Sequence, residues 1–322
     1  MDPDVLDQVR STCAAVADQA AHVRIDTNLL PSYAAGLPLD VLAAPAIDPA
    51  SHYLGRGEGT VAFLLTLGAI NFGSGYFPNL RKRPGMSGYF TVASGLNDHF
   101  RAHGPLSAAD LGRLTPGDCT RIFGQSPENT VAGELMGLFA TALNDLGRFL
   151  IHRFAGSFSA LVAAADASAV RLVMLLREMP FYEDVASYGS LRVHFFKRAQ
   201  LTAADLALAF GGQGPGRFDD LRRLTLFADN LVPHVLRMDN VLVYDENLAA
   251  RIDAGERIER GSPAEIELRA CAVHAVEKLC AALGTQGRRV LPMELDYLLW
   301  NRGQHPYYKK IKPRHRTRTV FY

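Results

Sequence analysis

Residues 221–236 read LRRLTLFADNLVPHVL and surround one carboxylate, Asp229, with apolar side chains. Removing a lone carboxylate from water is expensive unless a partner or a function compensates for the cost. Asp is also favoured just before a helix, so Asp229 has a second interpretation as the cap of a helix that begins near Leu231. The stretch therefore predicts either a functional carboxylate or a helix cap, and it favours neither.

Composition sets the outer limits of the fold and of its partners. The chain has 322 residues, of which 48% are hydrophobic and 21% are charged, and this balance is typical of a globular protein with a large core. We expect a single globular domain over residues 1–322, either compact or divided into two helical lobes. The 34 basic and 33 acidic residues give a net charge of +1, which argues against a broad surface for duplex nucleic acid.

Cysteine usage and hydropathy indicate the compartment. The four cysteines form no CxxC pair, so we expect reduced thiols, no metal site and no cofactor. Residues 1–5 lack the basic and apolar features of a secretory signal, and no run approaches 18 apolar residues. These features predict a cytoplasmic protein without a membrane partner.

The apolar pattern predicts a mainly α fold with at most a minor β hairpin. Apolar residues at intervals of three to four predict an amphipathic helix over residues 5–23, and residues 36–50 read as an ordered loop. Residues 60–70 are apolar on every side, as in a helix buried in a core. Two glycines within residues 71–78 permit the close approach of another segment, although a plain helix end is the commoner explanation.

Helix starts and short strands complete this reading. A hydroxyl side chain ahead of an acid or a proline predicts five helix caps, at Ser107, Thr115, Ser126, Thr202 and Ser262. Residues 194–196 and 240–244 are candidates for short strands. Few other segments alternate with a period of two, so the helical prediction dominates.

Residues 295–301, LDYLLWN, form a second candidate site. Asp296 and Trp300 lie four positions apart, so they share one face of a helix. A planar ligand could stack on Trp300 or Tyr297 while Asp296 accepts hydrogen bonds from its N–H groups. A core aromatic residue beside a capping acid is the alternative explanation.

Basic residues cluster in two places. Lys197 and Arg198 follow two phenylalanines, which suits either a phosphate site or a solvated helix face. Residues 309–322 carry six basic residues and a histidine but end in the apolar Val-Phe-Tyr. That apolar end predicts a tail anchored in the body of the protein.

Several of these motifs together resemble the queuosine salvage proteins, the queuosine-nucleotide N-glycosylases. The resemblance runs from about residue 50 to the last residue, and its motifs lie at residues 196–200, 225–236, 265–277, 295–300 and 315–322. It implies a helical fold related to the helix-hairpin-helix DNA glycosylases and hydrolysis of queuosine 5′-monophosphate to the free base queuine. It also implies a small-molecule nucleotide as partner, without stably bound nucleic acid, and we expect a monomer.

The same resemblance implies roles for individual residues. Asp229 corresponds to the catalytic carboxylate of the family. Many relatives carry an acid where this chain has Asn301. The resemblance therefore does not predict a charged contact between residue 301 and the base or its amino side chain. Phe227 corresponds to an aromatic residue that lines the base pocket, and Asp296 and Tyr297 correspond to the acid and the aromatic residue that bind the base. His52 is the candidate for a histidine that contacts the ligand. The residues expected to bind substrate, phosphate site apart, are His52, Phe227, Asp296, Tyr297, Trp300 and Asn301.

The chemistry of N-glycoside cleavage fits this assignment. The reaction passes through an oxocarbenium-like transition state, which a carboxylate below the sugar can stabilise or trap covalently. Asp229 suits either role. A 5′-phosphate requires charge-assisted donors, for which the candidates are Lys197, Arg198, Arg316 and Arg318.

Two other functions are compatible with parts of the sequence. A glycosylase of the helix-hairpin-helix type that acts on nucleic acid would need a more basic surface than the net charge of +1 suggests. A queuine-binding protein without catalysis would need Asp296 and Tyr297 but not Asp229. Because the chain has Asp229, we expect the enzyme.

Overall fold

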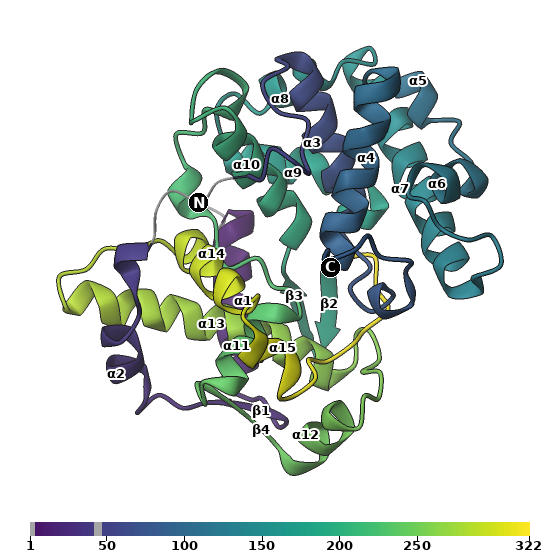
Figure 1. The fold of residues 1–322 in the computed structure, drawn as a ribbon. Helices are drawn as coiled ribbons and strands as arrows, with labels where there is room; N and C mark the ends of the chain where they lie inside the picture. Colours follow the sequence, from purple (N-terminus) through teal and green to yellow (C-terminus); the bar gives the residue numbers. More distant parts are fainter. Residues whose placement is uncertain (1–3, 42–46) are drawn as a thin grey trace.

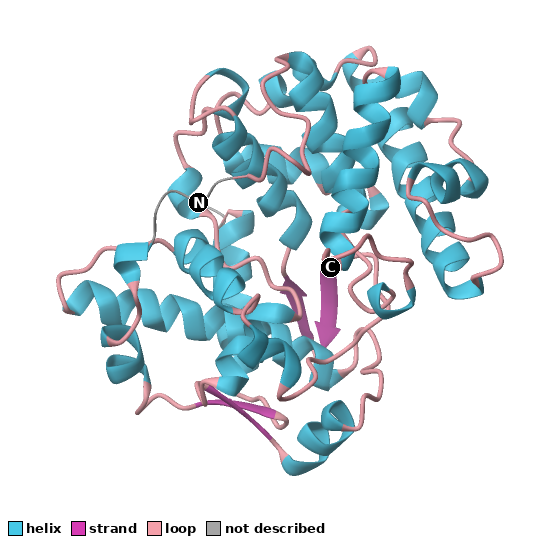
Figure 2. Cartoon of the chain, in the orientation of Figure 1, coloured by secondary structure: helices cyan, strands magenta, loops and turns pink. Residues whose placement is uncertain are grey.

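The computed structural model describes residues 4–41 and 47–322, and the described chain is mainly helical, as the sequence predicts (Figures 1 and 2). Its helices are α1 (Val5–Ala17), α2 (Leu30–Ala35), α3 (Glu58–Ile70), α4 (Gly88–His103), α5 (Ala108–Leu111), α6 (Pro116–Ile122), α7 (Thr130–Phe154), α8 (Phe158–Ala164), α9 (Ala169–Leu176), α10 (Lys197–Ala209), α11 (Leu231–Met238), α12 (Glu246–Asp253), α13 (Pro263–Thr285), α14 (Pro292–Arg302) and α15 (Pro306–Lys310). Its strands are β1 (Val23–Ile25), β2 (Val185–Tyr188), β3 (Leu191–His194) and β4 (Leu242–Tyr244). No helix in the described ranges is long and apolar enough to cross a membrane.

Two long buried helices organise the packing. Helix α3 is buried from Thr60 to Ile70 and packs against α10, α7, α8 and α4, so the predicted core helix is confirmed. Helix α13 packs against α1, α2, α11 and α14. In Figure 1 the first group lies at the top of the view and the second group below it. Apolar faces on these helices account for most of the buried core.

The strands form two small antiparallel sheets. Strands β2 and β3 make a hairpin in which Val185 pairs with His194. Strand β4 falls within the predicted segment 240–244, but its partner is β1, with Val23 opposite Tyr244. The sequence predicts at most one hairpin, whereas the described residues form two small sheets.

Strand β1 also corrects the first predicted helix. The pattern over residues 5–23 predicts one helix, but α1 ends at Ala17 and Val23 lies in the strand. The N–H groups of His22 and Val23 both donate to the buried carboxylate of Glu267, at 2.6 and 3.0 Å. These bonds hold the chain in an extended path that an apolar pattern cannot predict.

The helix caps confirm three of the five predictions. Ser107 and Thr115 each make a full capping box, and Ser262 accepts a hydrogen bond from the N–H of Glu265 at the start of α13. Ser126 is not a cap, because α7 begins four residues later and Asn129 caps it.

The predicted cap at Thr202 is also wrong, with consequences for the site. Thr202 lies inside α10, and its hydroxyl donates to the carbonyl oxygen of Arg198 one turn earlier, at 2.8 Å. The hydroxyl is therefore satisfied within the helix. The predicted cap placed Asp205 in the first turn of a helix, whereas in the structure Asp205 lies in the interior of α10.

The tail is ordered, as predicted. Val320, Phe321 and Tyr322 are buried, and the N–H of Gly73 donates to the Tyr322 carbonyl oxygen at 2.9 Å. A Cβ atom on Gly75 would lie 2.2 Å from the carbonyl oxygen of Thr317, so this glycine permits the close approach of two backbones. In the predicted loop over residues 36–50, a short helical turn occupies Leu39–Val41, and residues 42–46 lie outside the described part.

Candidate active site

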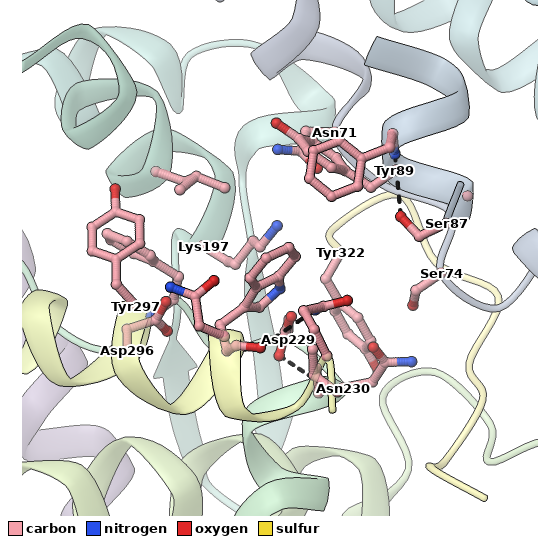
Figure 3. A pocket seen from close by; sticks show the side chains of 18 of the residues that line it. Asn71, Ser74, Ser87, Tyr89, Lys197, Asp229, Asn230, Asp296, Tyr297 and Tyr322 are labelled. Carbon is pink, nitrogen blue, oxygen red and sulfur yellow. Dashed lines mark hydrogen bonds between the residues drawn. The ribbon is translucent and has the colours of Figure 1, made fainter. Parts of the chain in front are cut away.

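A cavity of about 290 Å³ lies where the two groups of helices and the tail meet (Figure 3). One wall is a stripe of α10, and another comes from the segments before and at the start of α4. The remainder comes from the loop that leads into α11, from α14 and from the tail. The residues that line it include His52, Ser74, Tyr89, Lys197, Asp205, Phe227, Asp229, Asp296, Tyr297, Trp300, Asn301, Lys309 and Arg314.

Asp229 combines the two interpretations that the sequence left open. Its Oδ1 atom accepts hydrogen bonds from the N–H groups of Leu231 and Val232, at 2.7 and 3.1 Å, at the start of α11. The side chain is half-buried and faces the cavity (Figure 3). The positive end of the helix interacts favourably with this carboxylate. Asp229 thus satisfies the first turn of α11 through Oδ1, whereas Oδ2 accepts no hydrogen bond from the described residues.

A buried ion pair holds the loop that presents Asp229. Arg269 on α13 donates from its two terminal nitrogens to both carboxylate oxygens of Asp184, at 3.0 and 2.7 Å, and from Nε to the carbonyl oxygen of Ala228, at 3.1 Å. Asp184 also accepts the backbone N–H of Lys197 at 3.2 Å. One guanidinium therefore links the loop before Asp229 to the first turn of α10. Sequence reasoning missed this pair.

Asp296 and Lys197 share the cavity with Asp229 and interact with it (Figure 3). Asp296 is 4% exposed and accepts the N–H of Phe227 at 3.1 Å. Burial raises the pKa of Asp296 well above its usual range, and the nearby Asp229 carboxylate raises it further. Burial lowers the pKa of the Lys197 ammonium, and the charge of Asp229 opposes that effect most strongly. The cavity therefore holds two acids and an amine whose charges depend on one another.

Aromatic rings line the side of the cavity nearest α14. The Tyr297 ring meets Phe227 edge to face, with ring centres 6.0 Å apart, and Trp300 meets Phe90 in the same way at 6.5 Å. Trp300 and Asp296 lie on one helix, as their spacing predicts. The buried hydroxyl of Tyr297 has no hydrogen-bond partner among the described residues. This wall offers flat apolar surfaces together with an unsatisfied polar group.

His52 lines the cavity, but both of its ring nitrogens are engaged. Nδ1 lies 2.8 Å from the carbonyl oxygen of Asp48, and Nε2 lies 2.9 Å from the hydroxyl of Tyr89. A carbonyl oxygen only accepts, so Nδ1 carries the hydrogen and Nε2 accepts from the tyrosine. Burial lowers the pKa of His52, which favours this neutral form. His52 therefore orients Tyr89 at the edge of the cavity.

The predicted basic residues divide between the cavity and the core. Lys197 lines the cavity, whereas Arg198 does not. The Arg198 guanidinium donates to the carbonyl oxygens of Gly68, Ala69 and Phe181, with distances of 3.0 and 2.7 Å to the first two. These bonds satisfy carbonyl groups near the end of α3, which the helix itself leaves free.

In the tail, the cavity receives basic residues other than the predicted ones. Arg318 pairs with Glu134 at 2.9 Å, and Arg316 joins a backbone bridge to residue 257, so neither lines the cavity. Arg314 and Lys309 line it instead. Burial lowers the pKa of Arg314, and the charge of Asp229 opposes this effect. Among the described residues, no hydrogen bond or ion pair engages the Arg314 guanidinium.

Asp205 is a further acid in the cavity that sequence reasoning missed as a site residue. It lies on the face of α10 that also presents Lys197 and Leu201, at intervals of four residues. Burial raises the pKa of Asp205 to about 7, and Lys197 opposes the shift. The signal in the sequence was this spacing, which the incorrect cap at Thr202 concealed.

Comparison with known proteins agrees with the motifs. A family model described as "Queuosine salvage protein" matches residues 51–322. A protein from Sphaerobacter thermophilus named "Queuosine 5'-phosphate N-glycosylase/hydrolase" is 36% identical over 319 residues, which cover 98% of this chain and 97% of that protein. Proteins of the same name from Dictyostelium discoideum and Mus musculus are 34% and 31% identical, over 82% and 73% of this chain and 79% and 72% of their own lengths.

Proposed function

Because the chain belongs to the queuosine salvage protein family, we propose that it hydrolyses the N-glycosidic bond of queuosine 5′-phosphate and releases queuine. The observation that carries this proposal is the placement of Asp229. One of its carboxylate oxygens accepts hydrogen bonds at a helix start, and the residue lines a cavity together with a second acid and aromatic rings.

In the proposed reaction, the bond between C1′ of the ribose and N9 of the base breaks, and its electron pair leaves with the base. Positive charge develops on the ribose, and the Asp229 carboxylate stabilises it from below. Water then supplies a hydroxyl group to C1′ and a proton to the base. Asp229 either remains a free carboxylate or forms a transient bond to C1′ before water attacks.

The base is proposed to lie between the aromatic wall and Asp296. Queuine is a 7-deazaguanine, so its pyrimidine edge presents an N1–H and an amino group. We propose that Asp296 accepts hydrogen bonds from them, and such bonds to the charged form of the carboxyl group lower its pKa, which opposes the effect of burial. Tyr297, Trp300 and Phe227 supply flat contacts for the rings. The charges of both acids act on Lys197, which is therefore proposed to balance them as the substrate enters.

We propose that the 5′-phosphate binds Arg314 and Lys309 rather than Arg198, Arg316 or Arg318. Arg314 lines the cavity and is not engaged in a hydrogen bond or ion pair within the described ranges. Ser74 also lines the cavity, and its hydroxyl is buried without a partner among the described residues. Two charged donors and a hydroxyl suit the terminal oxygens of a phosphate monoester.

The remaining features of the proposal concern the form in which the protein works. We infer one globular domain whose helical fold is related to the helix-hairpin-helix DNA glycosylases, and this inference is supported by its mainly helical architecture. We also infer a cytoplasmic monomer that acts on a free nucleotide without a stable nucleic-acid partner. The net charge of +1 supports that last point.

The test compares three substrates in one buffer: queuosine 5′-monophosphate, the nucleoside queuosine and tRNA that contains queuosine. Released queuine is quantified by chromatography. Two or three charge-assisted hydrogen bonds, each worth roughly 1.5–3 kcal/mol, should favour the nucleotide over the nucleoside by about 100-fold or more in kcat/KM. Arg314→Gln should abolish most of this preference, whereas Arg318→Gln, which removes a partner of Glu134 outside the cavity, should retain it.

Each outcome bears on one part of the proposal. Equal efficiency on nucleotide and nucleoside would refute the phosphate site. Rapid release of queuine from tRNA would favour a glycosylase that acts on nucleic acid. Absence of queuine from all three reactions would refute the proposed activity.

A further inference from the structure

Asp205 is half-buried and lines the cavity without a partner among the described residues. No hydrogen bond or ion pair engages its carboxyl group in the described parts of the chain, and Lys197 acts on it only at longer range. An acid removed from water without a partner is costly in its charged form, so such groups are normally paired or serve a ligand. Asp205 therefore marks a place in the cavity where a positive charge is missing.

The surroundings of Asp205 suit an organic cation. Tyr89 on α4 and Tyr297 on α14 both line the cavity, and the charge of Asp205 acts on both phenol groups. The faces of aromatic rings attract alkylammonium groups, and rings beside a carboxylate form a common binding site for them. The Tyr297 hydroxyl has no partner among the described residues, so it can also bond to a polar group next to the cation.

Asp205 and Lys197 lie at separate points along the stripe of α10 that lines the cavity. Asp205 follows Lys197 by eight residues on one helix, which corresponds to about 12 Å along the helix axis. The charge of Asp229 acts on both Lys197 and Asp296. Neither Asp229 nor Asp296 is among the causes of the pKa shift of Asp205. A group at that end of the cavity is poorly placed to protonate the leaving base at the glycosidic bond.

We propose that Asp205 binds the charged secondary amine of the substrate's side chain. This proposal rests on the proposed function, because queuosine carries an aminomethyl arm that ends in a cyclopentenediol. A secondary alkyl amine is protonated at neutral pH, so it supplies the positive charge that the cavity lacks. Asp205 would thus determine specificity for a base that bears an amine, while Asp296 recognises the guanine-like edge that all such bases share.

The proposal is tested by the binding of three free bases that differ only in this arm. They are 7-deazaguanine, which has no arm, 7-aminomethyl-7-deazaguanine, which has the amine alone, and queuine. Isothermal titration calorimetry gives the Kd of each base for the wild-type protein and for Asp205→Asn. Asp98→Asn serves as a matched control, because Asp98 is a helical acid with a 62% exposed side chain.

The expected result is a loss confined to the bases with an amine. Asp205→Asn should weaken the binding of queuine and of 7-aminomethyl-7-deazaguanine by about 10-fold or more, the usual effect of losing a charged hydrogen bond. It should change the Kd of 7-deazaguanine by less than about twofold, which also shows that the cavity is intact. Asp98→Asn should bind all three bases like the wild type.

Three results would overturn the proposal. An equal loss for all three bases would mean that Asp205 supports the cavity as a whole, and no loss for any base would mean that it makes no contact. A loss for queuine alone would place the contact at the cyclopentenediol rather than at the amine. Because binding is measured without turnover, a wild-type protein that releases no queuine would refute the proposed function while leaving this test readable.

Discussion

Replacing Asp229 with asparagine separates its structural role from its proposed chemical role. The amide oxygen of asparagine can still accept the N–H groups of Leu231 and Val232, so the start of α11 should remain capped. The negative charge that faces the cavity is lost. We therefore expect Asp229→Asn to fold and to bind queuine like the wild type while losing nearly all turnover.

The size of the effect follows from the distance at which the charge acts. A carboxylate about 4 Å from the developing positive charge contributes about 4 kcal/mol at an effective dielectric constant of about 20. That energy corresponds to about a 10³-fold decrease in rate. The loss of one preorganised group that stabilises transition-state charge is typically in the range of about 10²- to 10³-fold.

The assay is single-turnover release of queuine from queuosine 5′-monophosphate, with enzyme in excess, quantified by chromatography. Calorimetry with queuine and thermal unfolding of the same preparation show whether binding and folding are preserved. Asp98→Asn again provides the control on an exposed helical acid. Turnover of Asp229→Asn within about tenfold of the wild type would refute the catalytic role of Asp229.

Three further predictions concern stability and its dependence on pH. A methyl group on Gly75 would lie 2.2 Å from a backbone oxygen of the tail, so Gly75→Ala should lower the free energy of unfolding by about 1–3 kcal/mol in a thermal scan. A methyl group on Gly137 in α7 would meet nothing within 4 Å, so Gly137→Ala should be neutral or stabilising in the same scan. Arg269→Met leaves Asp184 buried without its partner, so it should lower the free energy of unfolding measured in urea by about 3–5 kcal/mol. The double variant with Asp184→Asn should recover part of that loss, and a double variant less stable than Arg269→Met would contradict this reasoning. Folding raises the pKa of Asp205 to about 7, so the stability that the neutral acid contributes is fully present below about pH 4 and is lost as the pH rises to about 7. Relative to Asp205→Asn, the free energy of unfolding of the wild type should fall by on the order of 1 kcal/mol per pH unit between pH 5 and pH 7, and parallel pH profiles of the two proteins would refute the shift.

The sequence by itself determined the features that depend on near neighbours. The apolar run over residues 60–70 predicted a core helix, and the Ser262 capping motif predicted the start of α13, because helix periodicity and capping involve residues within a few positions of each other. The spacing of Asp296 and Trp300 placed both on one helix. The motif around Asp229 and the family resemblance together pointed to Asp229, which lines the cavity.

Only the tertiary structure decided which charged groups reach the cavity. Arg198 follows Lys197 directly, yet Arg198 bonds to the carbonyl groups of α3 while Lys197 lines the cavity, because successive residues of a helix point in different directions. Arg314 reaches the cavity whereas Arg318 pairs with Glu134, since the irregular path of the tail has no period from which side-chain directions follow.

The tertiary structure also decided the electrostatics of the site. Asp184 and Arg269 are 85 residues apart in the chain, and no local pattern predicts that they meet and hold the loop before Asp229. Asp205 became a cavity acid because α10 begins at Lys197 rather than after Thr202. Its pKa depends on how much water the surrounding helices exclude, which is a property of packing among segments far apart in sequence.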